Sequence, residues 1–482
     1  MNFSNFPSDL LRHTFSFFED SVKTLELLQS VCKNWKQISS NESIQNFSGI
    51  ETVSLNSVKF FWNTQNLFGL RTETVIIDNK IESDYDEKEE NSTYIQIAKT
   101  CPNMKCFWIE HNYFNDDAII EITERCPLIS KIKISGCQNF TDVSLYTLSR
   151  KNLKCVWLDF DLDVQVTDKG LTYFFENCSN IENLVYMVFS MDNNTNVSVS
   201  KISCLKNLVS LYVWSNEIDD TTLGEIVQGC PKLESLTIKS YSLTNNCVPE
   251  IVKRCPNLIH FDVEVSYTHD SYTLIANSYP NIEFFNFGKG ITDISLQYIL
   301  KKCTKMKKID LISFNDEESK FSNETLKEIS NCSELVELLI LKFSFDMSDD
   351  TFCQIIQKCK KLRILFIKNF DFSTQTLKEI SNCPSLETLE IINVDKFDEE
   401  CLIFILNNCK KLKKILFNNF DVSSELKNIY PNVNIEIPKN FYYDDEYTVY
   451  NNAIREIPNT RRRHRNRKQR HQRRRQRLRR RH

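Results

Sequence analysis

The feature that most constrains this chain is an internal repeat of about 25 residues, punctuated by cysteine. One strand-and-helix unit of that length cannot bury its own apolar face, so neighbouring units must stack into a solenoid. We call the recurring position the marker. The markers are Cys101, Cys126, Arg150, Cys178, Leu205, Cys230, Cys255, Tyr279, Cys303, Cys332, Cys359, Cys383, Cys409 and Tyr430.

Each marker before Tyr430 is followed by apolar residues three, six and eight positions later. After Cys230 these are Leu233, Leu236 and Ile238. The final alternation has period two, which is typical of a short strand.

A polar step, often Thr-Asp as at Thr292-Asp293, then precedes a stretch with apolar residues three or four apart. This pattern predicts a helix whose free amides are capped by the Thr or the Asp. The marker follows the helix, where a small buried hydrophobic residue fits between neighbouring repeats.

Strands shorter than helices force such a stack to curve, with strands on the concave side and helices on the convex side. The segment Cys126 to Leu145, CPLISKIKISGCQNFTDVSL, resembles the cysteine-containing leucine-rich repeat. The resemblance covers about residues 101–437 and implies a curved α/β leucine-rich-repeat solenoid. Residues 48–100 are interpreted as degenerate repeats with an acidic loop. Rim loops are expected where the repeat is too long, at Glu82–Ser92, Met191–Ser200 and Ser313–Lys320.

Residues 3–47 do not follow the repeat, and their apolar residues have helical spacing, which predicts a small all-α module. Phe6-Pro7-x-Asp9-Leu10-Leu11, Phe15-Ser16-Phe17-Phe18 and Val31-Cys32-Lys33-Asn34-Trp35 resemble the successive motifs of an F-box. The alternative is a generic helical cap on the first repeat. The resemblance implies contacts with a Skp-type adaptor from Pro7, Leu10, Leu11 and Phe15. Val31 and Trp35 would hold the F-box core together.

The F-box resemblance implies a substrate-recognition subunit of an SCF-type ubiquitin ligase, in which the adaptor links the chain to a cullin and the repeats bind a protein substrate. The alternative is a leucine-rich-repeat scaffold outside the ubiquitin conjugation pathway, with a basic tail that binds RNA or another polyanion. The sequence lacks H-E-x-x-H, G-x-S-x-G and Walker motifs. We therefore expect no intrinsic catalysis, no cofactor and no metal.

The predicted concave face carries large aromatic residues. Strand residues between the core positions point away from the core. Aromatic side chains are enriched at binding hot spots, so these positions form a predicted substrate patch with Glu110 and Asp159 as acidic neighbours. The alternative is that the rings pack sideways against adjacent strands. The patch residues are Trp108, Trp157, Tyr212 and Trp214.

The charge of the chain is divided unevenly. Residues 1–460 hold 46 Lys and Arg against 64 Asp and Glu, a net charge of −18, whereas residues 461–482 hold 13 Arg and one Lys. After a linker at 438–460, this tail is expected to be disordered because it has one apolar residue. Three roles remain open: an address for an import receptor, RNA or polyanion binding, and folding back on the acidic body. Its Arg clusters include Arg461, Arg462, Arg463, Arg473, Arg474 and Arg475.

The sequence contains no apolar stretch of the roughly 20 residues that span a bilayer, and its start lacks a secretory signal. The 18 cysteines include no C-x-x-C pair, so they are interpreted as reduced, mostly buried thiols. We expect a cytoplasmic or nuclear protein, or both, that is not secreted and does not contact a membrane.

Overall fold

The structure is a computed structural model that describes residues 52–55, 72–78, 87–110, 114–137, 139–160, 165–188, 196–216, 218–288, 291–311, 321–341, 347–418, 420–422 and 424–436. The chain divides into two compact units, unit 1 ending at Asn286 and unit 2 beginning at Phe287. The predicted F-box, the linker 438–460, the basic tail and the segment Ser313–Lys320 lie outside the described residues. No helix within these ranges is long and apolar enough to cross a membrane.

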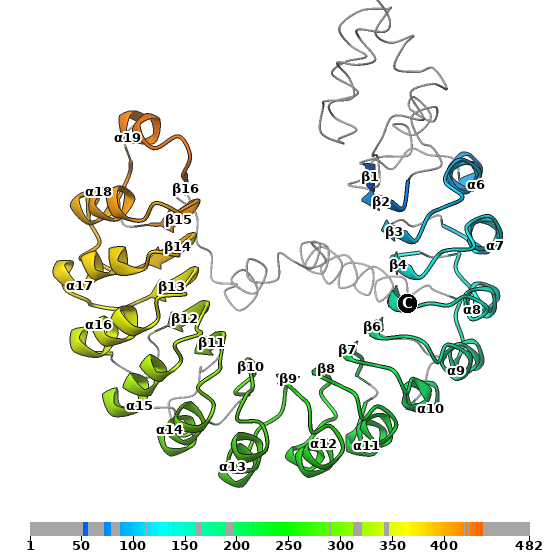
Figure 1. Ribbon diagram of the computed structural model, residues 1–482, viewed down its shortest axis with the longest axis horizontal. Coiled ribbons are helices and arrows are strands. Elements are labelled where there is room, and N and C mark those ends of the chain that lie inside the picture. Colours follow the sequence, from blue (N-terminus) through cyan, green and yellow to red (C-terminus); the bar gives the residue numbers. More distant parts are fainter. Residues whose placement is uncertain are drawn as a thin grey trace, which may run out of the picture. The chain divides into compact units, whose positions relative to one another are not determined.

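Unit 1 alternates parallel strands with helices (Figure 1). Each strand pairs with the next one along the chain, so the sheet grows in sequence order. The strands are β1 (Thr52–Leu55), β2 (Thr74–Asp78), β3 (Cys106–Glu110), β4 (Lys131–Ser135), β5 (Cys155–Phe160), β6 (Asn183–Val188), β7 (Ser210–Trp214), β8 (Ser235–Lys239), β9 (His260–Val263) and β10 (Phe284–Phe285). The helices are α6 (Glu87–Thr100), α7 (Asp116–Arg125), α8 (Asp142–Leu148), α9 (Asp168–Asn177), α10 (Asn196–Ser200), η3 (Lys201–Cys204), α11 (Asp220–Gly229), η4 (Asn245–Cys247), α12 (Val248–Arg254) and α13 (His269–Ser278).

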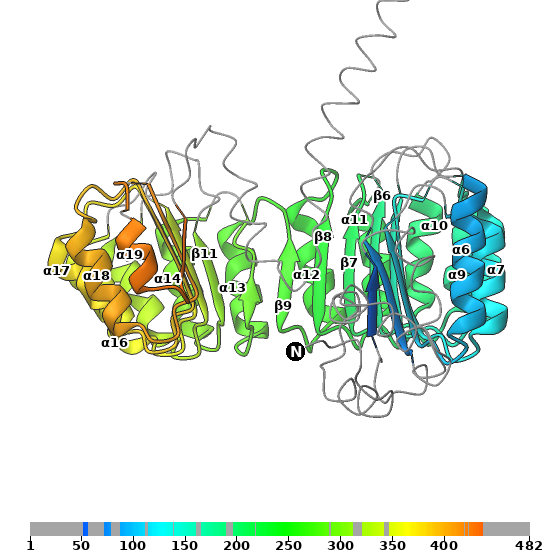
Figure 2. The same cartoon turned by 90° about the horizontal axis from the view of Figure 1, so that it is seen from above.

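Unit 2 repeats the same scheme, and its neighbouring strands also pair in parallel (Figure 2). Its strands are β11 (Lys308–Leu311), β12 (Glu337–Leu341), β13 (Ile364–Lys368), β14 (Thr388–Ile392), β15 (Lys414–Phe417) and β16 (Asn434–Glu436). Its helices are α14 (Asp293–Lys302), α15 (Asn323–Lys327), η5 (Glu328–Asn331), α16 (Asp349–Lys358), α17 (Thr374–Lys378), η6 (Glu379–Asn382), α18 (Glu399–Asn408) and α19 (Ser424–Ile429). In each unit the strands line the inner side of the curve and the helices the outer side, which confirms the α/β leucine-rich-repeat solenoid.

The core of each unit lies between the sheet and its helices. Every second strand residue faces this layer, as Phe107, Ile109, Val156 and Leu158 do, and all four are fully buried. The period-two pattern of the sequence therefore predicted the core face correctly, because side chains alternate across a strand.

Several marker side chains donate a hydrogen bond to a backbone carbonyl of the preceding repeat. The Cys126 thiol donates to the Cys101 carbonyl oxygen, 25 residues earlier, over 3.4 Å. The Tyr279 hydroxyl donates to the Cys255 carbonyl oxygen over 2.9 Å. Cysteine and tyrosine can alternate at this position because both are largely apolar and still satisfy a buried carbonyl. The predicted burial of the markers past their helices is confirmed for the cysteines.

The Thr-Asp step performs two separate tasks. Thr141 caps its own helix by accepting a hydrogen bond from the Val143 amide. Asp142 reaches the next repeat, where its carboxylate accepts from the Thr167 amide at 2.8 Å and the Thr167 hydroxyl at 2.6 Å. The sequence predicted a cap by either residue, whereas the structure assigns the cap to Thr and a link between repeats to Asp.

Two rim-loop predictions are partly wrong. Residues 87–92 of the expected loop Glu82–Ser92 belong to α6, and residues 196–200 of the expected loop Met191–Ser200 form α10. In α6, Tyr94, Ile97 and Ala98 recur at helical spacing and are buried, which outweighs the polar start of the segment. Two strands, β1 and β2, precede Cys101 within residues 48–100, the segment interpreted as degenerate repeats.

Candidate functional site

The four predicted patch residues lie on the concave side of unit 1, away from the core. Trp108 pairs with Lys133, which pairs with Trp157; Val185 then separates Trp157 from Tyr212. Trp214 lies two residues after Tyr212 on the same face of β7. All four side chains are half-buried. The structure therefore brings the predicted aromatic residues together across β3 to β7.

Lys133 fills the space between two of these aromatic residues. Its Nζ lies 4.4 Å from the centroid of the Trp157 ring and also pairs with the Glu110 carboxylate. The Lys133 side chain is only 4% exposed, so the ammonium is largely desolvated. Cation–π attraction strengthens when water is removed. Trp157 therefore packs against its neighbour, as the alternative interpretation expected, while remaining partly accessible.

One polar atom of this cluster is a buried donor whose hydrogen bond is not made within the described part of the chain. The indole N–H of Trp157 is buried and has no hydrogen-bond acceptor among the residues that the structure describes. Leaving a buried donor unsatisfied is unfavourable by about 1–3 kcal/mol.

The two acidic neighbours are not open carboxylates. Glu110 pairs with Lys133, and Asp159 Oδ2 accepts a hydrogen bond from the Ser135 hydroxyl at 2.7 Å. Asp159 is buried. These carboxylates therefore order the face on which the aromatic residues lie, rather than offering free charge.

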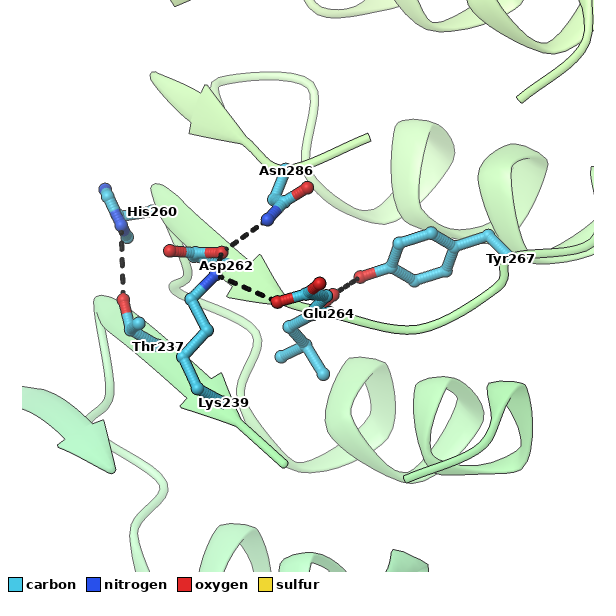
Figure 3. A network of polar contacts seen from close by, with 8 residues as sticks. Thr237, Lys239, His260, Asp262, Glu264, Tyr267 and Asn286 are labelled. Atoms are coloured by element: carbon cyan, nitrogen blue, oxygen red, sulfur yellow. Dashed lines mark hydrogen bonds and ion pairs between the residues drawn. The ribbon is translucent and has the colours of Figure 1, made fainter. Parts of the chain in front are cut away.

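A second cluster lies on β8 to β10 and was only partly recognised in the sequence (Figure 3). Lys239 Nζ lies 2.8 Å from Asp262 Oδ1 and 3.8 Å from a Glu264 oxygen. Asn286 Nδ2 donates to Asp262 Oδ1 at 2.7 Å. The ring of His260 stacks on Phe284 with the centroids 4.5 Å apart. Lys239 and Glu264 occupy the same position in their repeats as Trp214, whose side chain points away from the core. The alternation of strand side chains therefore predicts both residues on the concave face.

Both charges of this cluster are stabilised in the folded state. Burial raises the pKa of Asp262, but the Lys239 ammonium and the hydrogen bonds from Lys239 and Asn286 bring it below its usual range. Burial lowers the pKa of Lys239, but the Asp262 charge and hydrogen bond raise it above its usual range. Glu264, whose side chain is 49% exposed, is the accessible carboxylate of the cluster.

The concave strand positions of unit 2 are more apolar than those of unit 1. Leu339 and Phe366 are buried and pack with Ile392 and the partly buried Leu416. Apolar residues on adjacent strands gain more by contact with one another than by contact with water. The aromatic and charged candidates are therefore concentrated in unit 1.

No family model and no curated protein matches the sequence. Among solved structures, the chain is similar to one in the crystal structure of the Rad7 and Elc1 complex in yeast, with 13% identity, a TM-score of 0.40, and coverage of 89% of this chain and 92% of that chain. It is also similar to the TLR13–ssRNA13 complex, with 14% identity and a TM-score of 0.37, covering 82% of this chain and 62% of that chain. Both likenesses are too distant to bear on function.

Proposed function

We propose that this protein is the substrate-recognition subunit of an SCF-type ubiquitin ligase. The observation that carries the proposal is the order of two sequence features. F-P-x-D-L-L and V-C-K-x-W, at Phe6–Leu11 and Val31–Trp35, precede a leucine-rich-repeat solenoid with a concave aromatic face. An adaptor-docking module joined to a binding surface is the arrangement that such a receptor requires.

In this proposal the N-terminal module binds a Skp-type adaptor and, through it, a cullin. Burial of Pro7, Leu10, Leu11 and Phe15 would supply about 1.5–3 kcal/mol for each large side chain, enough to offset association costs. The unit 1 patch of Trp108, Trp157, Tyr212 and Trp214, whose side chains are half-buried, would bind the protein substrate.

The chain itself would be non-catalytic. Burial raises the pKa of the Cys126 thiol to about 12 and that of the Cys359 thiol to about 11. Thiol transfer of ubiquitin needs a thiolate, so these marker cysteines are poor nucleophiles. We place the protein in the cytoplasm, the nucleus or both, with the basic tail as a candidate address for an import receptor.

The test is capture of a purified Skp-type adaptor and cullin by the full chain. Pro7→Ala combined with Leu10→Ala and Leu11→Ala should abolish capture. Tyr212→Ala with Trp214→Ala should leave it unchanged, which makes this pair the matched control. Failure of the folded wild-type chain to bind the adaptor would contradict the proposal.

The second candidate is a scaffold that binds a polyanion through its tail, favoured by the 13 Arg and one Lys in residues 461–482. The tail has no aromatic residue, so it offers charge without base stacking. Deletion of residues 461–482 should then abolish RNA binding and flatten its dependence on salt. Unchanged binding after the deletion would exclude the tail as the binding element.

A further inference from the structure

Three turns of unit 2 are strongly basic, independently of the tail. These are the turns that lead from a helix through its marker into the next strand. Residues 301–308, 358–363 and 409–414 together hold 13 Lys and Arg and no acidic residue. Eleven of these 13 side chains are exposed, among them Lys305, Lys361, Arg363, Lys411 and Lys413.

The repeat aligns these turns in a row at the end of the unit 2 sheet where its strands begin, and we call this end the edge. The Val336 amide donates to the Lys307 carbonyl, the Arg363 amide to the Val336 carbonyl, the Glu387 amide to the Arg363 carbonyl, and the Lys413 amide to the Glu387 carbonyl. Basic turns therefore alternate with the turns that carry Cys332 and Cys383. With about 4.8 Å between strands, successive basic turns lie about 10 Å apart.

The intervening turns supply carboxylates, but these lie beneath the cations. Lys361 pairs with Glu334 at 2.5 Å, and the side chains are 59% and 36% exposed. Arg363 and Lys413 both pair with Glu387, at 2.7 and 2.8 Å. Glu387 is 21% exposed, whereas Arg363 and Lys413 are 54% and 72% exposed. The glutamates therefore hold the cations in place, and the outermost layer of this edge is positive.

The repeat itself does not require these lysines. At the position of Lys305, Lys361 and Lys411, two after the marker, unit 1 has one lysine, Lys232, and one leucine, Leu128. The other six repeats of unit 1 have asparagine there: Asn103, Asn152, Asn180, Asn207, Asn257 and Asn281. Cations near a helix C-terminus are favourable by about 0.3–1 kcal/mol. Yet α8, α9, α11 and α13 have no basic residue in their last turn. Helix capping alone does not account for the concentration in unit 2.

We propose that this row of basic turns binds the phosphate backbone of a nucleic acid without sequence preference. Lysine is a flexible point charge suited to phosphate contacts, and phosphate contacts position a nucleic acid without reading its bases. None of the three turns contains an aromatic residue that could stack on a base. A regular polymer matches this regular row better than an acidic protein segment does.

The experiment uses the full chain with Lys305→Ser, Lys361→Ser and Lys411→Ser. Serine is compatible with this position because Ser385 occupies it in the β14 repeat. Lys232→Ser is the matched control, since Lys232 is an exposed lysine at the same position of a unit 1 repeat. The probes are a labelled 20-base-pair DNA duplex and a poly-U RNA, titrated at several salt concentrations.

We expect the triple variant to bind at least one probe tenfold or more weakly at low salt, and the slope of log affinity against log salt to fall by about 2–3. The control should bind as the wild type does. Replacing the same three lysines by Arg should preserve binding, because the charge is kept. Weakening of only one probe identifies the nucleic acid concerned.

The proposal is overturned if the triple variant binds both probes with wild-type affinity and slope, which would leave the tail as the binding element. It is equally overturned if the variant loses binding to a poly-glutamate peptide alone, which would indicate an acidic protein partner. Should the triple variant not fold, Lys305→Ser with Lys411→Ser replaces it. Neither of these two lysines forms an ion pair within the described part of the chain.

Discussion

The ammonium of Lys133 lies against the ring of Trp157 and pairs with the Glu110 carboxylate, so three adjacent strands share one buried charge. This cluster lies on the concave face of unit 1, across β3, β4 and β5. Its buried ion pair affects stability, and its ring belongs to the proposed binding patch. The two roles can be separated by choosing which partner is changed.

Glu110→Gln should lower the free energy of unfolding by about 3 kcal/mol, because it leaves the Lys133 ammonium buried without its counter-charge. Glu110→Gln combined with Lys133→Met should recover most of that loss, since no uncompensated charge remains. Urea unfolding of the two single variants and the double variant measures the coupling. If the two single losses simply add in the double variant, the pair is not coupled.

Tyr212→Ala with Trp214→Ala should weaken the binding of a protein substrate about 30-fold or more without unfolding the chain, as expected for hot-spot residues. Trp157→Ala should also weaken it, but with an added loss of stability, because Lys133 packs on that ring. Quantitative comparison of co-purifying proteins, with circular dichroism of each variant, checks this. Equal recovery of every partner by all variants would show that these aromatic residues do not bind the substrate.

Two helix glycines should respond in opposite ways to alanine. In α11, a Cβ on Gly224 would meet its nearest atom at 3.9 Å, so Gly224→Ala should stabilise by about 0.5–1 kcal/mol through helix propensity. In α9, a Cβ on Gly170 would lie 2.1 Å from Asp142 Oδ1. That carboxylate is held by Thr167, so Gly170→Ala should destabilise by about 1–3 kcal/mol. Thermal unfolding of both variants tests the link between repeats, and a stabilised Gly170→Ala would contradict it.

Alkaline pH should unfold the solenoid through its marker thiols. Burial raises the pKa of Cys178 and Cys230 from 9.0 to about 12. Below pH 9 the thiols are protonated in both states, and their contribution to stability is fully present. Between pH 9 and 12 they ionise only when unfolded, so stability falls as the pH rises. Cys178→Ala should reduce this slope by up to one proton, or about 1.4 kcal/mol per pH unit, measured by denaturant unfolding from pH 8 to 11. An unchanged slope would show that Cys178 does not contribute.

The candidate site was predictable where the alternation of strand residues decides it. Trp108, Trp157, Tyr212 and Trp214 lie on the face that their positions in L-x-L predicted. The partners of these residues were not predictable, because Glu110, Lys133 and Trp157 come from three strands whose register brings them together. The same limit explains why Asp159 was expected to be an open acid and instead accepts from Ser135.

The repeat, its strand and helix, the buried marker cysteines and the curved α/β solenoid follow from the amino-acid pattern, because each of these depends on a period of two, of three to four, or of about 25 residues. Which charges are exposed follows from the packing of the repeats against one another. Parallel stacking places Glu334 and Glu387 beneath Lys361, Arg363 and Lys413, and places Lys133 between two tryptophans. Such relationships join residues 23 to 27 positions apart, whose distance and burial are set by the packing of whole repeats rather than by local pattern.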